Sequence, residues 1–399
     1  MTAPLHGLLV ADFSRVLAGP LATMTLADLG ATVVKVERPG AGDESRAWGP
    51  PWTEYGSSYY ESLNRSKYSV TLDLTDPDDR TRALELARRA DVVVENFKPG
   101  SLDRLGLDYA SVAALNPRAV YCTITGFGEA GGRDRPGYDF LVQAVGGLMS
   151  VTGDADGEPT KVGAPLVDVL TGKDAVIGIL AALAARERTG EGQHVRVELL
   201  SSLLGGLINQ TAGYLTTGVA PIRMGNRHPS VVPYQTLHCA DVPIAVACGN
   251  DGQFARLVEV IGRPELAADP RFATNGDRVA NRDALVEALE GGLAARPAAE
   301  WEERLVAVGV PAGLVGDVGD ALARAESFGL APTITPDGGR TRLVRHPVRY
   351  SATPPAPAAP PPGLGEHAVA IAAWLDDPAA GSLPHPGEFS APRADGTAR

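Results

Sequence analysis

Residues 8–37 read LLVADFSRVLAGPLATMTLADLGATVVKVE, and this stretch decides the fold. Leu8–Ser14 is a short run rich in strand-forming residues, and Pro20–Leu29 has helical character until Gly30 ends it. Proline in the first turn of a helix and glycine just past its end is the usual asymmetry of helix ends. Ala31–Glu37 is again apolar and rich in valine. The stretch therefore predicts a strand, a helix and a second strand in succession.

The same alternation continues along the chain. Further strands are predicted at Ser69–Leu74, Asp91–Phe97 and Ala119–Gly126, with a helix near Asp78–Ala90. His194–Leu200 indicates one more strand. Strands that alternate with helices predict an α/β fold in which helices cover a parallel sheet.

The pattern changes twice after this region. Asp168–Arg188 is predicted as a long apolar helix, and a boundary falls near Gly218–Arg227. Helices and a short strand are expected beyond it, until the character changes again near Thr333–Gly339. His346–Ser351 then indicates a strand, and Gly365–Leu375 indicates a last helix. The length of 399 residues also predicts more than one domain.

Composition narrows the classes of function. The formal net charge is −12, whereas nucleic-acid binders usually carry a basic excess, so we expect no nucleic-acid partner. No run of about 18 apolar residues is present, so no membrane partner is expected either. Cys122, Cys239 and Cys248 fit neither a zinc site nor a disulfide framework. We therefore expect no metal and a cytoplasmic location.

Several cations lie close to the ends of predicted strands. Lys67 directly precedes one strand, Lys98 follows another with Arg104 one turn later, and Arg38 follows the second strand. Because ligands of open α/β sheets bind at the carboxyl ends of strands, this pattern favours a phosphate-bearing ligand. The alternative is a set of solvated surface charges. Only Gly19 of a three-glycine dinucleotide fingerprint is present, which argues against a nicotinamide cofactor.

Two carboxylates lie in apolar surroundings, Asp139 within Gly137–Val142 and Asp168 within Gly163–Leu170. A carboxylate among apolar residues is costly unless it is paired, caps a helix or has a function. Each aspartate is therefore either a helix N-cap or a functional group. Gly249–Gln253 suits either a mobile lid or an ordinary turn from strand to helix.

A set of motifs occurs in order over nearly the whole chain: Asp12–Pro20 (DFSRVLAGP), Val34–Gly40 (VKVERPG), Asn64–Lys67 (NRSK), Val94–Gly100 (VENFKPG), Thr189–Gln193 (TGEGQ), Arg349–Ser351 (RYS) and Leu364–His367 (LGEH). Together these motifs resemble the class III coenzyme A transferase family (CaiB/BaiF type). Several separate matches at similar spacing make the resemblance specific.

The resemblance implies the architecture and the substrates. A Rossmann-like large domain would be built from both chain ends, residues 1–222 and 329–399, with a smaller α/β domain from residues 223–328. Two such subunits would interlock as a homodimer. The substrates would be an acyl-CoA and a free carboxylic acid, so coenzyme A is a substrate and no cofactor is bound permanently.

The resemblance also assigns site residues position by position. Asp168 matches the family's nucleophile, and Asp139 matches a second acidic position near the site. A mobile glycine-rich loop corresponds to Gly249, Asn250 and Gly252, with fewer glycines than the family pattern. The positions that match the CoA-binding residues are Arg15, Val16, Arg38, Lys67, Asn96, Phe97, Lys98 and Arg104.

Tyr138 distinguishes two activities within this superfamily. The related acyl-CoA racemases carry a histidine at this position as an acid/base group. A phenol with an ordinary pKa of about 10 is a poor base at neutral pH, so we predict CoA transfer. An acyl-CoA racemase or epimerase is the main alternative. A CoA-binding protein without activity and a nicotinamide-dependent oxidoreductase are further alternatives.

The motifs Arg46–Pro51, Val232–Gln235 and Gly249–Phe254 look most like the succinyl-CoA:glutarate type of this family. We therefore expect succinyl-CoA or a similar donor and a dicarboxylate acceptor. Arg46 or Arg15 would meet the distal carboxylate, because a guanidinium fork fits a carboxylate in two-point contact. The reaction would pass through an aspartyl-CoA thioester on Asp168.

Overall fold

The computed structural model describes residues 2–336, 341–377 and 379–386. The chain forms two compact units, the first from residues 1–148, 162–218 and 331–399 and the second from residues 149–161 and 219–330. The sequence predicts domain limits at residues 222 and 329, and the limits between the two units lie at residues 218 and 331. Residues 149–161, which the sequence interpretation leaves in the large domain, group with the second unit.

The first unit is built on a six-stranded sheet in which every strand pairs in parallel with its neighbours. Its order is β5-β2-β1-β6-β7-β8. Numbered within this sheet alone, that order is 3-2-1-4-5-6, which is the order of doubly wound nucleotide-binding sheets. The strands are β1 (Leu9–Asp12), β2 (Thr32–Glu37), β5 (Lys67–Thr71), β6 (Val92–Glu95), β7 (Val120–Thr125) and β8 (His194–Glu198).

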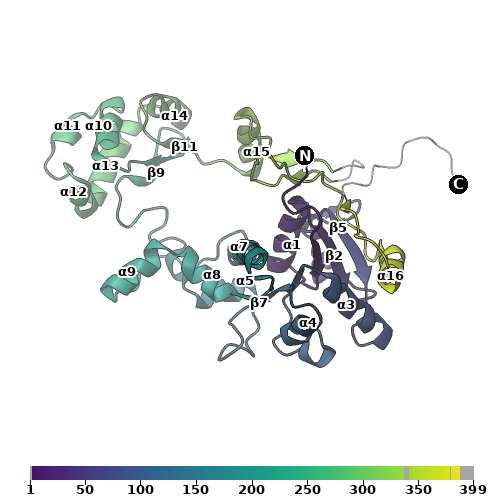
Figure 1. The fold of residues 1–399 in the computed structure, drawn as a ribbon. Helices are drawn as coiled ribbons and strands as arrows, with labels where there is room; N and C mark the ends of the chain where they lie inside the picture. The colour runs from purple at the N-terminus through teal and green to yellow at the C-terminus, as the bar shows by residue number, and fades with distance from the viewer. Residues whose placement is uncertain (1, 337–340, 378, 387–399) are drawn as a thin grey trace, which may run out of the picture. The chain divides into compact units, whose positions relative to one another are not determined.

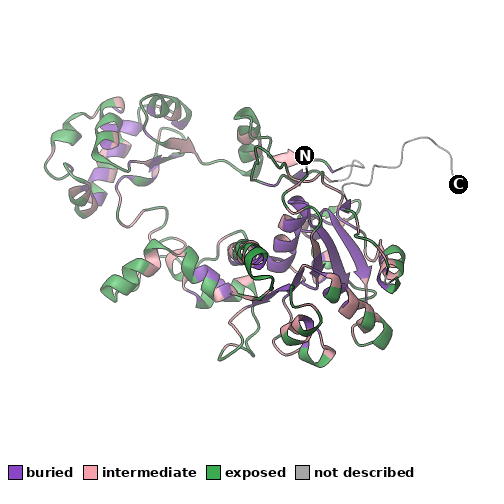
Figure 2. Ribbon diagram, in the orientation of Figure 1, coloured by how far each residue is buried: buried purple, intermediate pink, exposed green. Residues whose placement is uncertain are grey.

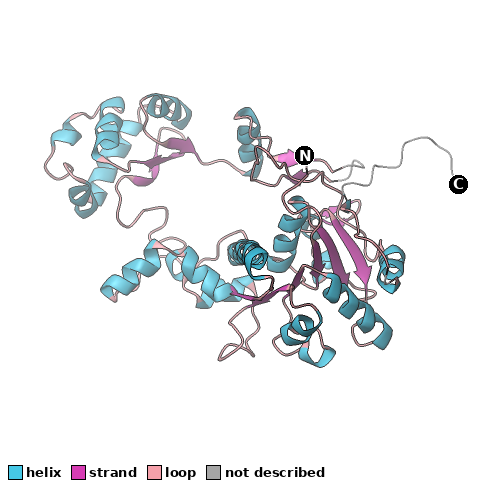
Figure 3. Ribbon diagram, in the orientation of Figure 1, coloured by secondary structure: helices cyan, strands magenta, loops and turns pink. Residues whose placement is uncertain are grey.

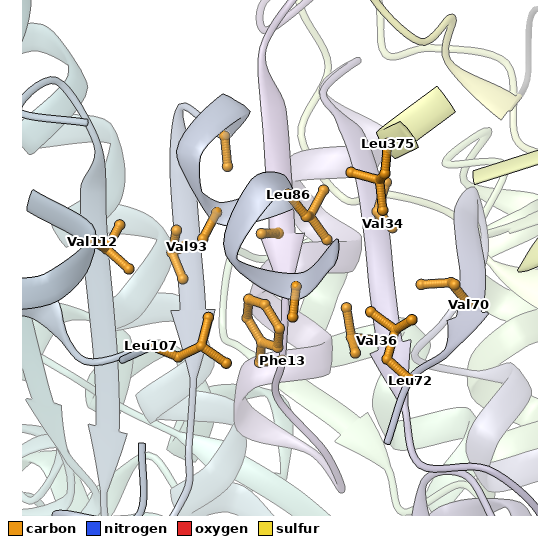
Figure 4. Close-up of a cluster of buried hydrophobic side chains, with 14 of the residues drawn as sticks. Phe13, Val34, Val36, Val70, Leu72, Leu86, Val93, Leu107, Val112 and Leu375 are labelled. Atoms are coloured by element: carbon orange, nitrogen blue, oxygen red, sulfur yellow. The ribbon is translucent and has the colours of Figure 1, made fainter. Parts of the chain in front are cut away.

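Helices cover both faces of this sheet (Figures 1 and 3). On one face lie α3 (Pro77–Arg89), α4 (Tyr109–Leu115) and α16 (Ala368–Asp376), whose side chains share a core cluster with the strands. Figure 4 shows Leu86 of α3 and Leu375 of α16 over Val34 and its neighbours. On the other face, α1 (Ala18–Asp28) and α7 (Leu166–Thr189) pack against each other.

Because both faces are covered, β2, β6 and β7 are buried along their whole length (Figure 2). This explains why β2 and β6 are rich in valine on both sides instead of alternating apolar with polar residues.

The end of the chain returns to the open edge of the sheet at β5. The Ser66 N–H donates to the Ala359 carbonyl at 3.1 Å, and the Ser69 N–H donates to Nδ1 of His367 at 3.2 Å. The Tyr68 hydroxyl donates to the Pro384 carbonyl at 3.0 Å. The C-terminal segment is therefore an integral part of the first unit.

The second unit contains a three-stranded antiparallel sheet of order β11-β10-β9. Its elements are β9 (Tyr234–His238), β10 (Pro243–Ala247), α10 (Asp251–Val260), α11 (Glu265–Ala268), α12 (Asn275–Ala280), α13 (Arg282–Leu293), α14 (Ala298–Ala307), β11 (Ala312–Leu314) and α15 (Val318–Ser327). The helices and the sheet enclose a separate core that includes Leu257, Phe272 and Leu289.

Short elements complete the first unit. They are η1 (Glu44–Ala47), β3 (Trp52–Thr53), β4 (Gly56–Ser57), α2 (Ser58–Glu61), η2 (Asp103–Leu105), α5 (Asp139–Val145), α6 (Leu148–Val151, which continues into the second unit), α8 (Leu199–Gly206), α9 (Asn209–Thr217), β12 (Thr333–Ile334) and β13 (Leu343–Val344). None of the helices described is long and apolar enough to cross a membrane.

One predicted strand was wrong. The sequence places a strand at His346–Ser351, whereas β13 is Leu343–Val344 and no strand follows it through residue 351. Pro347 lies within the predicted run and has no N–H to donate to a ladder, which explains the earlier end.

Candidate functional site

A cavity of about 440 Å³ opens at the carboxyl ends of the central strands of the first unit. The loops that follow β1, β6 and β7 line it, together with Asp168 of α7. The strand order reverses between β1 and β6, and ligands of open α/β sheets bind at such a point. The fold therefore places this cavity where a ligand site is expected.

A second hollow of about 290 Å³ lies at the carboxyl ends of β1, β2 and β5. Arg38 and the residues 72–75 line it. Arg15 and Phe97 line both hollows, and the Arg15 guanidinium lies over the Phe97 ring at 5.3 Å from its centre. The two hollows therefore meet at a cation–aromatic contact, which suits one elongated ligand.

The loops after β1 and β6 are tied together. The Arg15 N–H donates to Oδ1 of Asn96 at 3.0 Å, and Nδ2 of Asn96 donates to the Arg15 carbonyl at 2.8 Å. The next residue, Val16, has a φ of 70°, which is unfavourable for a β-branched side chain. Its N–H donates to both carboxylate oxygens of Asp43 at 3.1 Å, which helps to hold this conformation.

Lys67 takes a different position from the one that the resemblance implies. It lines neither hollow, and its side chain is fully buried. Its ammonium donates to Asp12 at 3.1 Å, to Asn64 at 2.9 Å and to the Pro20 carbonyl at 3.0 Å. Burial lowers the pKa of Lys67 to about 8, and the charge of Asp12 opposes that shift.

Lys35 forms a second buried ion pair beside the first. Its ammonium contacts Asp43 at 2.9 Å and donates to the Ser14 carbonyl at 2.8 Å. Although burial opposes it, the charges of Lys67 and Lys35 hold the pKa of Asp12 at about 2. This buried network lies under the loops after β1 and β2 and fixes them.

The other expected cations occupy three different settings. Lys98 lines the larger cavity and pairs with Asp134 at 3.0 Å, on the surface. Arg104 is exposed on η2 and lines neither hollow. Arg46 binds both oxygens of Glu37 at 2.7 Å and lines a separate hollow. Of the two arginines considered for the distal carboxylate, only Arg15 therefore faces the larger cavity.

Asp168 lies in the first turn of α7, whose N-cap, Pro165, has no side-chain acceptor. Asp139, at the start of α5, supplies one: its Oδ1 accepts the N–H groups of Val167 at 2.8 Å and Asp168 at 3.2 Å. Asp139 thus acts as the cap for another helix. Burial, with the nearby charge of Asp139, raises the pKa of Asp168 to about 7.

Two tyrosines accompany this carboxylate pair. Tyr138 precedes α5, lines the cavity and is 56% exposed. Tyr59 of α2 was not predicted. Burial raises its pKa to about 12, and the charges of Asp168 and Asp139 contribute to that shift. The Tyr59 and Trp48 rings pack edge to face, with 5.2 Å between the ring centres. The dense aromatic content of residues 48–60 was the available signal.

The loop after β7 contributes residues that the sequence analysis missed, among them Arg133 and Arg135. Gly126 and Gly137 close its base. A Cβ on Gly126 would lie 2.5 Å from the Gly137 backbone, so both positions require glycine. Among the described residues, no three His, Cys, Asp or Glu side chains gather as they would around a metal ion.

The glycine-bearing segment Gly249–Gln253 belongs to the second unit, where it leads into α10. Asn250 caps that helix by accepting the Gln253 N–H at 2.9 Å, and Gln253 accepts the Gly249 N–H at 2.8 Å. Neither Gly249 nor Gly252 has a positive φ. The segment has the form of a capped strand-to-helix turn in this structure.

Residues 5–368 match the model of CoA-transferase family III. The chain is 42% identical to succinate–glutarate CoA-transferase of Agrobacterium fabrum, over 94% of this chain and 96% of that protein. It is 39% identical to human succinyl-CoA:glutarate CoA-transferase, over 95% and 88% of the two chains. It is 46% identical to acetyl-CoA:oxalate CoA-transferase of Acetobacter aceti, over 80% and 82%.

A solved structure agrees with these sequence matches. The crystal structure of a CAIB/BAIF family protein from Brucella suis superposes with a TM-score of 0.84 and 44% identity, over 94% of this chain and all of that chain. The likeness extends across the α/β architecture described above.

Asp168 should make stability depend on pH. Its carboxyl has a pKa of 3.8 when unconstrained and about 7 when folded, so the folded state binds more protons between these values. The folded state therefore loses stability as the pH rises from about 4 to about 7, and Asp168→Asn removes that loss. We expect the variant to exceed wild type in free energy of unfolding by more at about pH 8 than at about pH 5. Urea unfolding at both pH values measures this, and equal differences would contradict the raised pKa.

Proposed function

Since the chain belongs to CoA-transferase family III and is a CoA-transferase, we propose that it moves coenzyme A from succinyl-CoA or a similar donor to a dicarboxylate through an aspartyl-CoA thioester on Asp168. One observation carries the proposal. Asp168 lines the cavity at the carboxyl edge of the sheet, and it lies in the first turn of α7. The positive end of that helix favours a carboxylate at this position.

The proposed chemistry conserves the thioester bond. A carboxylate oxygen of Asp168 attacks the donor carbonyl and forms a carbon–oxygen bond. The carbon–sulfur bond breaks, so CoA leaves as a thiolate and a mixed anhydride of Asp168 and the donor acid is formed. The thiolate attacks the aspartyl carbonyl, which releases the donor acid as a carboxylate and leaves an aspartyl-CoA thioester. The acceptor carboxylate then repeats both steps in reverse. Water must be kept out, because it would hydrolyse the activated aspartyl group.

The two hollows suggest how CoA enters as a substrate without any permanently bound cofactor. We place its nucleotide part in the smaller hollow, where Arg38 offers a guanidinium to phosphate. The pantetheine chain would pass the Arg15–Phe97 contact and bring the thioester to Asp168 in the larger cavity. Asn96 supports this path by joining the loops after β1 and β6.

A racemase activity at the same site is the second candidate, because the Asp168 pKa of about 7 also suits a proton-abstracting base. Tyr138, where the related racemases carry a histidine, favours transfer.

In the proposed transfer, Asp139 would hold the nucleophile in place by accepting the N–H groups of Val167 and Asp168.

The dicarboxylate preference is supported by Arg15 and by the names of the relatives. Two of these names give succinate or succinyl-CoA together with glutarate. The Arg15 side chain is 43% exposed and pairs with Glu44 at 2.7 Å, which leaves donors of its guanidinium for a distal carboxylate.

The three cysteines form no disulfide, in keeping with a cytoplasmic setting.

The proposed interlocked homodimer is supported by exposed apolar side chains on α7, α8 and α9 of the first unit. They are Ile177, Leu204, Tyr214 and Leu215. Leu215 is 82% exposed, and large apolar side chains left exposed on neighbouring helices are typical of a protein interface.

Trapping the intermediate tests the proposed nucleophile. After incubation with succinyl-CoA, hydroxylamine should leave an adduct on the peptide that contains Asp168, and Asp168→Asn should lose both the adduct and acyl exchange. Asp174→Asn, an exposed change on the same helix, is the matched control and should retain both. Exchange of the substrate α-proton with deuterated water, without acyl exchange or adduct, would instead establish the racemase.

Arg15 can be tested by comparing acceptors. In Arg15→Gln, loss of a charged hydrogen bond should raise the KM for glutarate roughly 10- to 100-fold. The KM for a monocarboxylate of similar length should change much less, since it has no distal charge. Steady-state kinetics with both acceptors measures the contrast. Equal effects on the two acids would remove Arg15 from acceptor recognition.

Sedimentation equilibrium tests the dimer. We expect wild type at twice the chain mass of 41.5 kDa. Leu215→Glu should weaken the assembly, because it introduces a charge among the exposed apolar side chains. Leu115→Glu on α4 is the control, since Leu115 is exposed but lies outside that group. A monomeric wild type would contradict the proposal.

A further inference from the structure

Gln143 lies one turn along α5 from Asp139 and is 1% exposed. A buried primary amide must satisfy both its donor and its acceptor side, because an unpaired polar group in the interior is destabilising. The contacts of this amide are therefore informative about what the protein holds in place here.

Both sides of the Gln143 amide are used. Its Nε2 donates to Oδ2 of Asp139 at 2.6 Å, and its Oε1 accepts the Val162 N–H at 2.9 Å. These two partners fix which end of the amide is the nitrogen, because a carboxylate only accepts hydrogen bonds and a backbone N–H only donates.

These contacts join two anchors of the same segment. Gln143 holds Val162, and Asp139 holds Val167 and Asp168. The chain from residue 162 to residue 168 is thus fixed at both ends from one turn of α5. Within this arrangement, Oδ2 of Asp139 is held by Gln143 while Oδ1 is held by the backbone of α7.

We propose that Gln143 is a positioning residue for the nucleophile. It fixes the rotation of the Asp139 carboxylate and the path of residues 162–168, and thereby sets where the Asp168 carboxylate lies in the cavity. The inference rests on the proposed role of Asp168 as nucleophile. Gln143 itself is not among the residues that line the larger cavity, so its effect passes through Asp139 and Val162.

The geometry predicts a separation of rate from binding. The residues proposed to hold CoA come from the loops after β1, β2 and β6, whereas the Gln143 hydrogen bonds go to Asp139 and Val162. Loss of the amide should therefore misplace the nucleophile while the donor still binds. A displacement of about 1 Å at a reacting group costs on the order of 100-fold in rate.

Three variants and a control make the test. Gln143→Leu removes both hydrogen bonds at similar volume. Gln143→Glu keeps an acceptor for the Val162 N–H but sets a carboxylate against Asp139. Gln143→Met serves if either of these does not fold. Asn116→Ala is the control. The Asn116 amide donates to two backbone carbonyls and accepts a backbone N–H within the first unit, yet it lines neither hollow.

The measurement is formation of the hydroxylamine-trapped aspartyl adduct with succinyl-CoA, on protein shown by circular dichroism to be folded. We expect the maximal rate to fall on the order of 100-fold in each Gln143 variant, with the donor KM within about threefold of wild type. The control should keep the wild-type rate.

Two other results would contradict, respectively, the positioning role of Gln143 and the proposed nucleophile. A wild-type maximal rate in a folded Gln143 variant, or a fall matched by the control, would overturn the positioning role. If wild-type protein catalyses acyl exchange but forms no adduct at Asp168, the proposed nucleophile fails instead, and the Gln143 inference falls with it.

Discussion

The first βα turn of this protein depends on a charge that is buried out of contact with solvent. The Lys67 ammonium bridges Asp12 of β1, the Pro20 carbonyl of α1 and Asn64 before β5. A buried ammonium is tolerated only with such complete pairing, so the three segments are held at fixed distances from one another. Above that base, Asp43, which pairs with the second buried ammonium of Lys35, holds the Val16 conformation. The Arg15–Asn96 hydrogen bonds then join the loops where the two hollows meet.

Much of the first unit could be predicted because its signals are local. Valine-rich strands such as β2 and β6 are buried on both faces, and this pattern is visible in the sequence. Asp168 and Asp139 were also detectable, since carboxylates among apolar residues need a reason to be there. The N-cap interpretation of Asp139 holds in part, because its carboxylate caps a helix, though not its own.

The remaining features depend on tertiary pairing and leave little trace in the sequence. Lys67 and Lys98 are both cations near strand ends, yet one is buried beneath the turn and the other lies on the surface beside the cavity. Arg46 is occupied by Glu37, which β2 presents from nine residues earlier. Gln143 meets Asp139 across one turn of α5, and Tyr59 comes under the influence of both carboxylates only through the packing of α2. Motif position therefore identified the region, and packing decided the individual roles.

The return of the chain to β5 bears on how this protein is made. Contacts to Ala359, His367 and Pro384 cover the edge strand of a sheet whose other strands are complete by residue 198. During synthesis on a ribosome, the edge of the sheet would therefore stay uncovered while residues 219–330 of the second unit emerge. Exposed strand edges invite pairing with other chains. The nascent chain is thus open to aggregation until residues 359–384 have emerged, and a truncation before Ala359 would leave the edge at β5 uncovered permanently.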